Sequence, residues 1–233
     1  AGNLDYSRNN RNKEPELIYN TISIPHGGEY SLVLSDGTQV FLNSMSEFRY
    51  PVQFVGHVRE VELTGEAYFI VSKDTQNPFK VKTKNMNIEV LGTSFNVNAY
   101  ETTGKVVTTL VEGKVKIQSE KASGDQILVP DEQAVFSVET GAISVNKVDV
   151  SMFTEWRNGQ LTFYNERLED LMTTLTRWYS ATVFYMNPSV KDLRFSGNLD
   201  RYGDIRQILD IIQSTNKLNI EIQNNTILFS EKE

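Results

Sequence analysis

The stretch VLGTSFNVNAY, residues 90–100, places Gly92, Thr93 and Ser94 between two apolar runs, where a nucleophile could sit on a tight turn. A nucleophilic serine on such a turn follows a strand in a G-x-S-x-G pattern, opens a helix and has a base nearby. Here the chain continues as a strand, and neither histidine of the sequence belongs to a recognisable triad. The pattern therefore favours a structural role for Ser94 and indicates no catalytic residue.

The apolar face of the chain changes parity at this point. Apolar residues occupy even positions before Gly92 and odd positions after Ser94: Ile88 and Val90, then Phe95, Val97 and Ala99. A strictly alternating strand cannot change parity without an extra residue or a bend. We therefore predict a β-bulge over residues 92–94, in which glycine supplies the backbone angles and the hydroxyls of Thr93 and Ser94 satisfy the freed amides. Phe95 and Asn96 complete the motif.

Other residue types in the β-rich part could also do chemistry. Glycosidases need two carboxylates held ~5–10 Å apart across a cleft, but Glu60 and Glu62 share the outward face of one strand, close to Glu66. His57 has no second metal ligand at a helical or hairpin offset. We therefore expect no enzyme activity, metal or other cofactor. Six aromatic residues could stack sugars but are more typical of the core and rim of a β domain: Phe48, Tyr50, Phe54, Tyr68, Phe69 and Tyr100.

Composition narrows the class of protein. The 233 residues are enough for one large or two modest domains with a real core, and the absence of cysteine excludes a disulfide framework. The net charge of −7 argues against nucleic-acid binding, which needs a concentrated basic face. No apolar run approaches the roughly 20 residues that span a bilayer. Because the chain lacks an initiator Met and a signal peptide, we expect that a preceding segment has been removed.

The pattern of the first half of the chain predicts a β domain. Residues 1–16 are polar and predict a linker or tether. Residues 17–152 alternate in short strands, with predicted hairpin turns at Asp36-Gly37, Glu112-Gly113 and near Thr140-Gly141. One of the strands runs through Gly65. This pattern predicts an antiparallel, mainly β domain, and it leaves a sandwich, a roll and a solenoid open.

The period changes near Trp156, so we assign residues 153–233 to a small α+β domain. Its predicted elements follow the order β-α-β, β-α-β, β, which is a repeated split βαβ unit. The first helix is predicted to have Asn165 as its N-cap, and the second to open on a capping box formed by Asp204 and Gln207.

The end of the chain predicts a hairpin around Asn224-Asn225. In a two-residue turn Glu221 lies opposite Leu228, on the face away from the apolar residues that should cover the helices. We predict that this last strand is a sheet edge, open to a strand of another protein, with Glu221 and Leu228 as partner-binding residues. The alternative is that Leu228 packs against the β domain.

Several long segments carry a family resemblance. The β domain contains LVLSDGTQVFLNSMSEFRYP, REVELTGEAYFIVSKDTQNPFKVKT, VLGTSFNVNAY and TTLVEGKVKI, and in this order they resemble the periplasmic domain of FecR-type anti-sigma regulators. The segments LTFYNERLEDLMTTLTRWYSATVFY and LRFSGNL resemble the extra C-terminal domain of such regulators from Bacteroidota-type bacteria. The matched motif residues are Asp36, Gly37, Gly65, Glu66, Gly92, Thr93, Ser94, Phe95, Asn96 and Gly113.

The resemblance implies the periplasmic part of a single-pass inner-membrane protein. Such a protein receives a signal from the periplasmic signalling domain of a TonB-dependent outer-membrane transducer and holds an extracytoplasmic-function sigma factor through a cytosolic segment. This sequence lacks the cytosolic segment, so we expect it to sense without binding the sigma factor itself. The alternative from a different class is a carbohydrate-binding or glycan-processing β domain, which needs a cleft with exposed aromatics and converging carboxylates.

Overall fold

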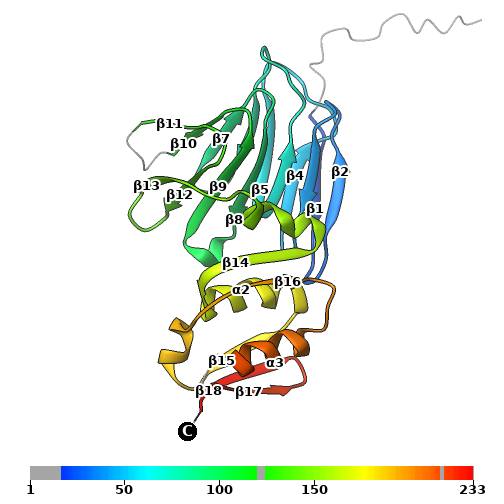
Figure 1. Cartoon of the computed structure of the whole chain (residues 1–233). Helices are drawn as coiled ribbons and strands as arrows, with labels where there is room; N and C mark the ends of the chain where they lie inside the picture. Colours follow the sequence, from blue (N-terminus) through cyan, green and yellow to red (C-terminus); the bar gives the residue numbers. More distant parts are fainter. Residues whose placement is uncertain (1–16, 120–123, 216–217, 233) are drawn as a thin grey trace, which may run out of the picture.

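The computed structural model describes residues 17–119, 124–215 and 218–232, so the predicted tether at residues 1–16 lies outside the described residues. The protein is mainly β, with a large strand assembly followed by a small α+β region, as predicted (Figure 1). The strands of the first part are β1 (Tyr19–Ser23), β2 (Tyr30–Val33), β3 (Gln39–Leu42), β4 (Glu47–Pro51), β5 (Arg59–Ile70), β6 (Phe79–Lys82), β7 (Asn87–Val90), β8 (Ser94–Ala99), β9 (Lys105–Glu112), β10 (Val115–Gln118), β11 (Gln126–Leu128), β12 (Glu132–Ser137) and β13 (Ile143–Lys147). A 3-10 turn, η1 (Glu101–Thr103), precedes β9.

These strands form two layers that share β5. The first half of β5 pairs with β4 and β6, in the layer β1-β4-β5-β6-β7-β10-β11. The second half pairs with β3 and β8, in the layer β2-β3-β5-β8-β9-β12-β13. Alternate side chains of both layers meet in one apolar core that includes Phe48, Val61, Phe69, Phe95 and Phe136. The architecture left open by the sequence is therefore a sandwich continuous through one strand.

Gly65 is the residue at which β5 passes from one layer to the other. Its φ of +100° lies in the region that favours glycine. A Cβ at this position would stand 2.6 Å from Cα of Ser46. The bend therefore requires glycine for both conformation and space.

The parity change after Val90 has a different form from the predicted bulge. β7 ends at Val90 and β8 begins at Ser94, and the two strands lie in different layers. Residues 91–93 thus carry the chain across the sandwich, and a smaller irregularity follows between Ser94 and Phe95 where β8 pairs with β9. Phe95 itself is buried and stacks on Phe69.

The predicted hairpin at Glu112-Gly113 is wrong, because this is a second crossing between the layers. β9 pairs with β8 and β12, whereas β10 pairs with β7 and β11. The two crossings touch, since the Thr93 hydroxyl donates to the Lys114 carbonyl at 3.1 Å. The hydroxyl therefore satisfies a carbonyl of the other crossing rather than a freed amide, and a Cβ at Gly113 would approach Thr93 Oγ1 to 2.8 Å.

The predicted turns at Asp36-Gly37 and near Thr140-Gly141 are present. β2 pairs with β3 and β12 pairs with β13, both antiparallel. The first turn is longer than the predicted two-residue loop, because Val33 lies opposite Gln39 and the Leu34 amide donates to the Thr38 carbonyl. Asp36 also has a role beyond the turn, because its carboxylate accepts a hydrogen bond from the Thr38 amide and forms a 2.6 Å ion pair with Arg59. Both charged side chains are largely buried, so the pair fixes the turn against the start of β5.

The second part of the chain contains short helices and two small sheets. Its elements are α1 (Ser151–Thr154), η2 (Glu155–Asn158), β14 (Gln160–Arg167), α2 (Leu168–Tyr179), β15 (Thr182–Tyr185), η3 (Pro188–Asp192), β16 (Arg194–Asp200), α3 (Ile205–Thr215), β17 (Leu218–Gln223) and β18 (Thr226–Glu231). The predicted order of strands and helices is confirmed. The strands pair as β14-β16 and as β15-β18-β17, not as one split βαβ sheet. The predicted domain boundary at residues 152 and 153 falls within α1.

The two predicted helix starts have different outcomes. Asn165 does not cap α2: it lies within β14 with φ of +51°, and the N-cap is Arg167, whose side chain makes no capping hydrogen bond. Asp204 does cap α3, because its side chain accepts a hydrogen bond from the Arg206 amide. Leu171, Leu175 and Ile208 belong to a second apolar core between the helices and the small sheets.

Candidate functional site at the junction of the two domains

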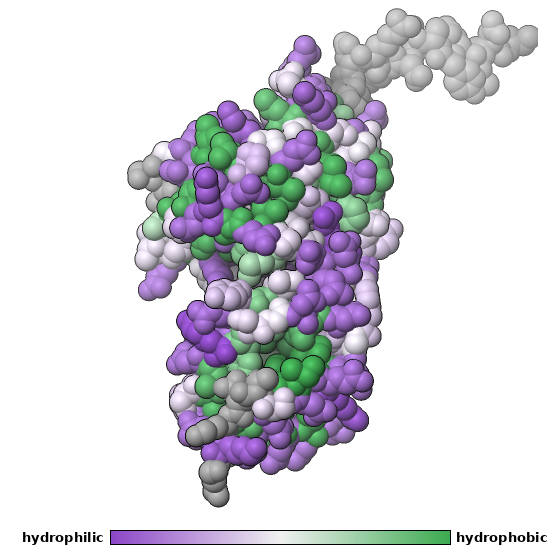
Figure 2. All heavy atoms as spheres, viewed as in Figure 1, coloured by the Kyte–Doolittle hydropathy of each residue, from purple (hydrophilic) through white to green (hydrophobic). Residues whose placement is uncertain are grey.

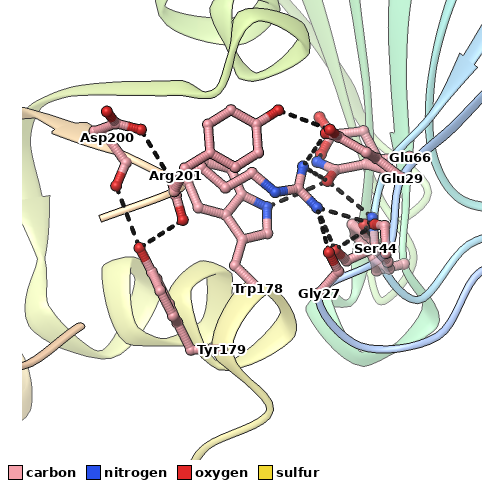
Figure 3. Close-up of polar contacts among 12 residues, drawn as sticks. Gly27, Glu29, Ser44, Glu66, Trp178, Tyr179, Asp200 and Arg201 are labelled. Atoms are coloured by element: carbon pink, nitrogen blue, oxygen red, sulfur yellow. Dashed lines mark hydrogen bonds and ion pairs between the residues drawn. The ribbon is translucent and has the colours of Figure 1, made fainter. Parts of the chain in front are cut away.

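Arg201 is the central residue of the junction between the sandwich and the α+β domain (Figure 3). It follows β16, and its side chain is only 3% exposed although it carries a permanent charge. The guanidinium donates hydrogen bonds to Asn43 Oδ1 at 3.0 Å, Ser44 Oγ at 2.6 Å and the Gly28 carbonyl at 2.9 Å. It also pairs with Glu29 at 3.1 Å. One side chain of the second domain thus binds two loops of the first.

The loop before β2 fits closely against the end of α2. The amide of Gly27 donates to the Arg177 carbonyl at 2.9 Å, which joins the two domains through their backbones. Gly27 has φ of +70°, and a Cβ there would lie 2.9 Å from the Trp178 carbonyl oxygen. Tyr202 adds a further contact, because its hydroxyl donates to the Glu29 carboxylate at 2.7 Å.

Both tryptophans of the chain donate across the junction to asparagines of the sandwich. Trp156 Nε1 donates to Asn96 Oδ1 at 3.1 Å, and Trp178 Nε1 donates to Asn43 Oδ1 at 3.2 Å. Each indole therefore buries an apolar ring and satisfies its only donor. Trp156 belongs to η2 and Trp178 to α2, so the contacts fix two elements of the second domain on β8 and on the loop that follows β3.

Glu66 lies behind these asparagines as a half-buried carboxylate. It accepts hydrogen bonds from Asn43 Nδ2 at 2.8 Å and Asn96 Nδ2 at 2.9 Å. No ion pair of Glu66 occurs within the described ranges of the chain. Burial raises the pKa of Glu66 above its usual value, against the opposing effect of the asparagine amides. The network Glu66–Asn43/Asn96–Trp178/Trp156, with Arg201 on Asn43, is called the junction network below.

The raised pKa of Glu66 predicts a pH dependence. A carboxyl with a higher pKa when folded binds more protons in the folded state, so unfolding becomes easier as pH rises above its unfolded value near 4.5. Glu66→Gln removes this titration, and we expect a flatter rise in unfolding free energy from pH 7 down to pH ~4.5 by urea denaturation. Glu60→Gln, on the outward face of β5, is the control. If the unfolding free energy of wild type and of Glu66→Gln changes equally with pH, the pKa of Glu66 is not raised. The comparison uses the pH dependence and not the absolute stability, because the new amide cannot accept both asparagine donors.

The sequence motif residues do not gather in one place. Glu66 and Asn96 belong to the junction network, whereas the turn and crossing residues described above stabilise the sandwich. The six aromatics are not arranged to stack sugars: Phe48, Tyr68, Phe69 and Tyr100 are buried, and Tyr50 and Phe54 are half-buried against the core. In the described part of the chain no group of three or more His, Asp or Glu residues could hold a metal ion.

The predicted partner-binding residues lie at the far end of the α+β domain (Figure 1). The predicted register of the last hairpin is confirmed, with Glu221 opposite Leu228. The predicted edge position is wrong, because β18 is the central strand between β15 and β17. Leu228 also does not pack against the sandwich; it shares the outer face of the small sheet with Phe184 of β15, while Ile227 and Phe229 enter the core.

Sequence reasoning missed Asn43, Trp178 and Arg201 as junction residues. Arg201 follows a strand in a polar loop, where an arginine is usually solvated. The available signal was the pair of tryptophans, since a large side chain with one donor needs an acceptor when it is buried. That signal identifies residues that need a partner, but not which asparagines supply it.

Comparison with known proteins agrees with this arrangement. The FecR protein family model matches residues 20–116, and the FecR C-terminal model matches residues 160–229. Two crystal structures of a proposed anti-sigma factor from Parabacteroides distasonis, at 1.65 and 2.50 Å resolution, each match with a TM-score of 0.84 and 29% identity. The matches cover 92% and 93% of this chain and 100% of the other. A comparison with curated proteins found no match.

The two matched ranges together cover more than half of the chain and include Asn43, Asn96, Trp178 and Arg201 of the junction, whereas Trp156 lies between the two ranges. No helix among the described residues is long and apolar enough to cross a bilayer. The chain belongs to the FecR-type family of anti-sigma factors.

Proposed function

We propose that this chain is the periplasmic sensor portion of a membrane-anchored anti-sigma factor and that it acts without catalysis. In this proposal it receives a signal from the periplasmic signalling domain of a TonB-dependent outer-membrane transducer. A cytosolic segment of the whole protein holds the extracytoplasmic-function sigma factor. The observation that carries the proposal is the family membership, which includes both the sandwich and the C-terminal domain.

The outer face of the sheet β15-β18-β17 supplies a surface for the transducer. Leu228 is half-buried there, Phe184 is 56% exposed, and Met186, which follows β15, is 66% exposed. A cluster of apolar side chains on a solvent-facing sheet is typical of a protein-binding surface. Glu221 lies beside Leu228 and gives the cluster a charged rim.

Leu228→Glu tests this surface. We expect binding to the transducer's periplasmic signalling domain to weaken about ten- to thirtyfold, the cost of losing an interface hot spot. The melting temperature should change little, because Leu228 is outside the apolar core. Isothermal titration of the chain with signalling domains of TonB-dependent transducers from the same genome measures the binding constant.

Ile211→Glu is the matched control, since Ile211 is a 58% exposed aliphatic residue on α3, away from this sheet face. It should leave the binding constant unchanged. If wild-type chain binds none of the signalling domains, the relay proposal fails. If wild type and Leu228→Glu bind equally well, the relay stands and the surface lies elsewhere.

A further inference from the structure

A group of exposed apolar side chains lies at the end of the sandwich where the described chain begins. Figure 1 shows the blue start of the described chain at the end of the sandwich opposite the α+β domain. In Figure 2 hydrophobic residues are exposed among hydrophilic ones toward this end. The group is called the sandwich tip below; its members are between 39% and 63% exposed, and they are Leu17, Ile18, Val52, Val55, Val58 and Leu91.

The pairing of β1 with β4 brings the first part of the sandwich tip together. Tyr19 of β1 lies opposite Pro51 of β4. One step further along both strands, the Val52 amide donates to the Ile18 carbonyl at 2.8 Å. The start of the described chain therefore adjoins the loop between β4 and β5.

The pairing of β5, β6 and β7 brings the remaining residues to the same end of the layer. Phe79 of β6 lies opposite both Arg59 of β5 and Val90 of β7. Val58 precedes Arg59 and Leu91 follows Val90. Since β5 is antiparallel to β4, both residues lie beyond the end of the sheet at which β4 also ends.

The loop between β4 and β5, residues 52–58, is held by packing and hydrogen bonds. Phe54 packs against the apolar core and meets Phe79 edge-on. Arg59, at the end of the loop, is buried and donates to the Asn77 carbonyl at 2.9 Å. The loop therefore presents Val55 and Val58 to the outside from fixed ends.

The loop also lacks the charges found elsewhere on this layer. The segment PVQFVGHV, residues 51–58, contains no Asp, Glu, Lys or Arg. The strands beside it have ion pairs between exposed or half-buried side chains, such as Arg49 with Glu62. Exposed apolar groups on an uncharged loop are typical of a surface that another apolar phase covers. The absence of carboxylates also avoids repulsion by anionic lipid headgroups.

The path of the chain indicates which partner covers the sandwich tip. Sixteen residues precede Leu17 in the sequence, and fully extended they span at most about 55 Å. In the regulator proposed above, the membrane anchor lies before Ala1. The anchor thus holds the sandwich tip near the bilayer, whereas the surface proposed for the transducer lies in the other domain. Such a tether raises the local concentration, so a weak contact is enough to orient the domain.

We propose that the sandwich tip rests on the lipid bilayer, with the side chains of Val52, Val55 and Val58 among the lipid headgroups. This inference rests on the proposed membrane anchorage and adds lipid as a partner of the chain. It orients the molecule with the sandwich on the membrane and the sheet β15-β18-β17 directed away from it (Figure 1).

A dye that responds to the polarity of its surroundings tests the contact. The chain has no cysteine, so Val52→Cys can carry a single nitrobenzoxadiazole label. The labelled whole chain is joined through its N-terminus to a phospholipid in vesicles of phosphatidylethanolamine and phosphatidylglycerol. We expect emission at least about twofold above that of the same chain in solution, because the label passes from water into the lipid interface. The label at Ile211→Cys, on α3 of the other domain, is the control and should show no rise.

Val55→Asp tests the loop itself. With the label at Val52→Cys, the added charge should remove at least about half of the rise, because it resists transfer out of water. Ile211→Asp is the matched variant and should leave the rise unchanged. Both side chains are exposed, so neither aspartate should alter the melting temperature.

Three results would overturn the lipid contact: no rise at Val52→Cys, an equal rise at Ile211→Cys, or a rise that Val55→Asp leaves intact. A rise that needs no vesicles and grows with protein concentration would assign the sandwich tip to a second copy of the chain and would also overturn it. Because the lipid is attached artificially, these results do not depend on transducer binding. The relay and the lipid contact can therefore fail separately.

Discussion

Replacing Arg201 by methionine is expected to lower the free energy of unfolding by about 3 kcal/mol. The variant keeps much of the apolar stem but removes the donors for Asn43 Oδ1, Ser44 Oγ and the Gly28 carbonyl. Asn43 Oδ1 keeps Trp178 Nε1 as a donor and the Gly28 carbonyl keeps the Ser44 hydroxyl. The loss is therefore that of hydrogen bonds to a charged group, about 1.5–3 kcal/mol each, and it is partly offset because the variant no longer buries the guanidinium. The ion pair with Glu29 adds little, because Glu29 is 40% exposed. Urea denaturation measures the change.

Arg206→Met is the control for this prediction, since Arg206 is exposed on α3 and should tolerate methionine within about 0.5 kcal/mol. The domains should also separate more easily in Arg201→Met. Limited proteolysis is then expected to cut faster near Trp156, where the chain passes from one domain to the other. An unchanged midpoint together with unchanged proteolysis would show that Arg201 does not hold the junction.

Patterns confined to neighbouring residues could be predicted from the sequence. The position of the turn at Asp36-Gly37 follows from its turn residues, although not its length, and the register of Glu221 with Leu228 follows from alternation and turn length. The parity change after Val90 was also visible. These three features could be predicted because each depends only on the direction of side chains along a short segment.

Choice of strand partner could not be predicted in the same way. Glu112-Gly113 has the sequence of a hairpin turn, but β10 pairs with β7 instead of β9. The last strand, β18, was predicted to be an edge but is central, because β15 pairs with its other side. Both pairings depend on how strands far apart in the sequence pack in the apolar core, and the alternation of residues within one strand does not show this. The junction network is harder still, because Arg201 and Asn43 are far apart in sequence and neither residue type normally predicts burial.

Gly92 is required in the structure for a reason that the sequence did not indicate. Its φ is +146°, and a Cβ would stand 2.7 Å from Cα and 2.9 Å from Cβ of Lys73. The contact with the Lys73 backbone cannot be relieved by a side-chain rotation. The neighbouring crossing at Gly113 also restricts movement, because Thr93 Oγ1 is bonded to Lys114. The requirement for glycine therefore comes from close packing between segments as well as from backbone angles.

Gly92→Val is accordingly expected to destabilise the protein by more than about 3 kcal/mol, through backbone strain and the clash with Lys73. Ser94→Ala is the matched comparison two residues away. Within the described residues the Ser94 hydroxyl has no hydrogen bond from which to predict a loss, so this variant should stay within about 0.5 kcal/mol of wild type. Thermal and urea unfolding of both variants measure the difference. A Gly92→Val protein that unfolds like wild type would show that the crossing can shift to admit a side chain, whereas a Ser94→Ala protein that keeps its stability but loses signalling in the whole regulator would give Ser94 a functional role.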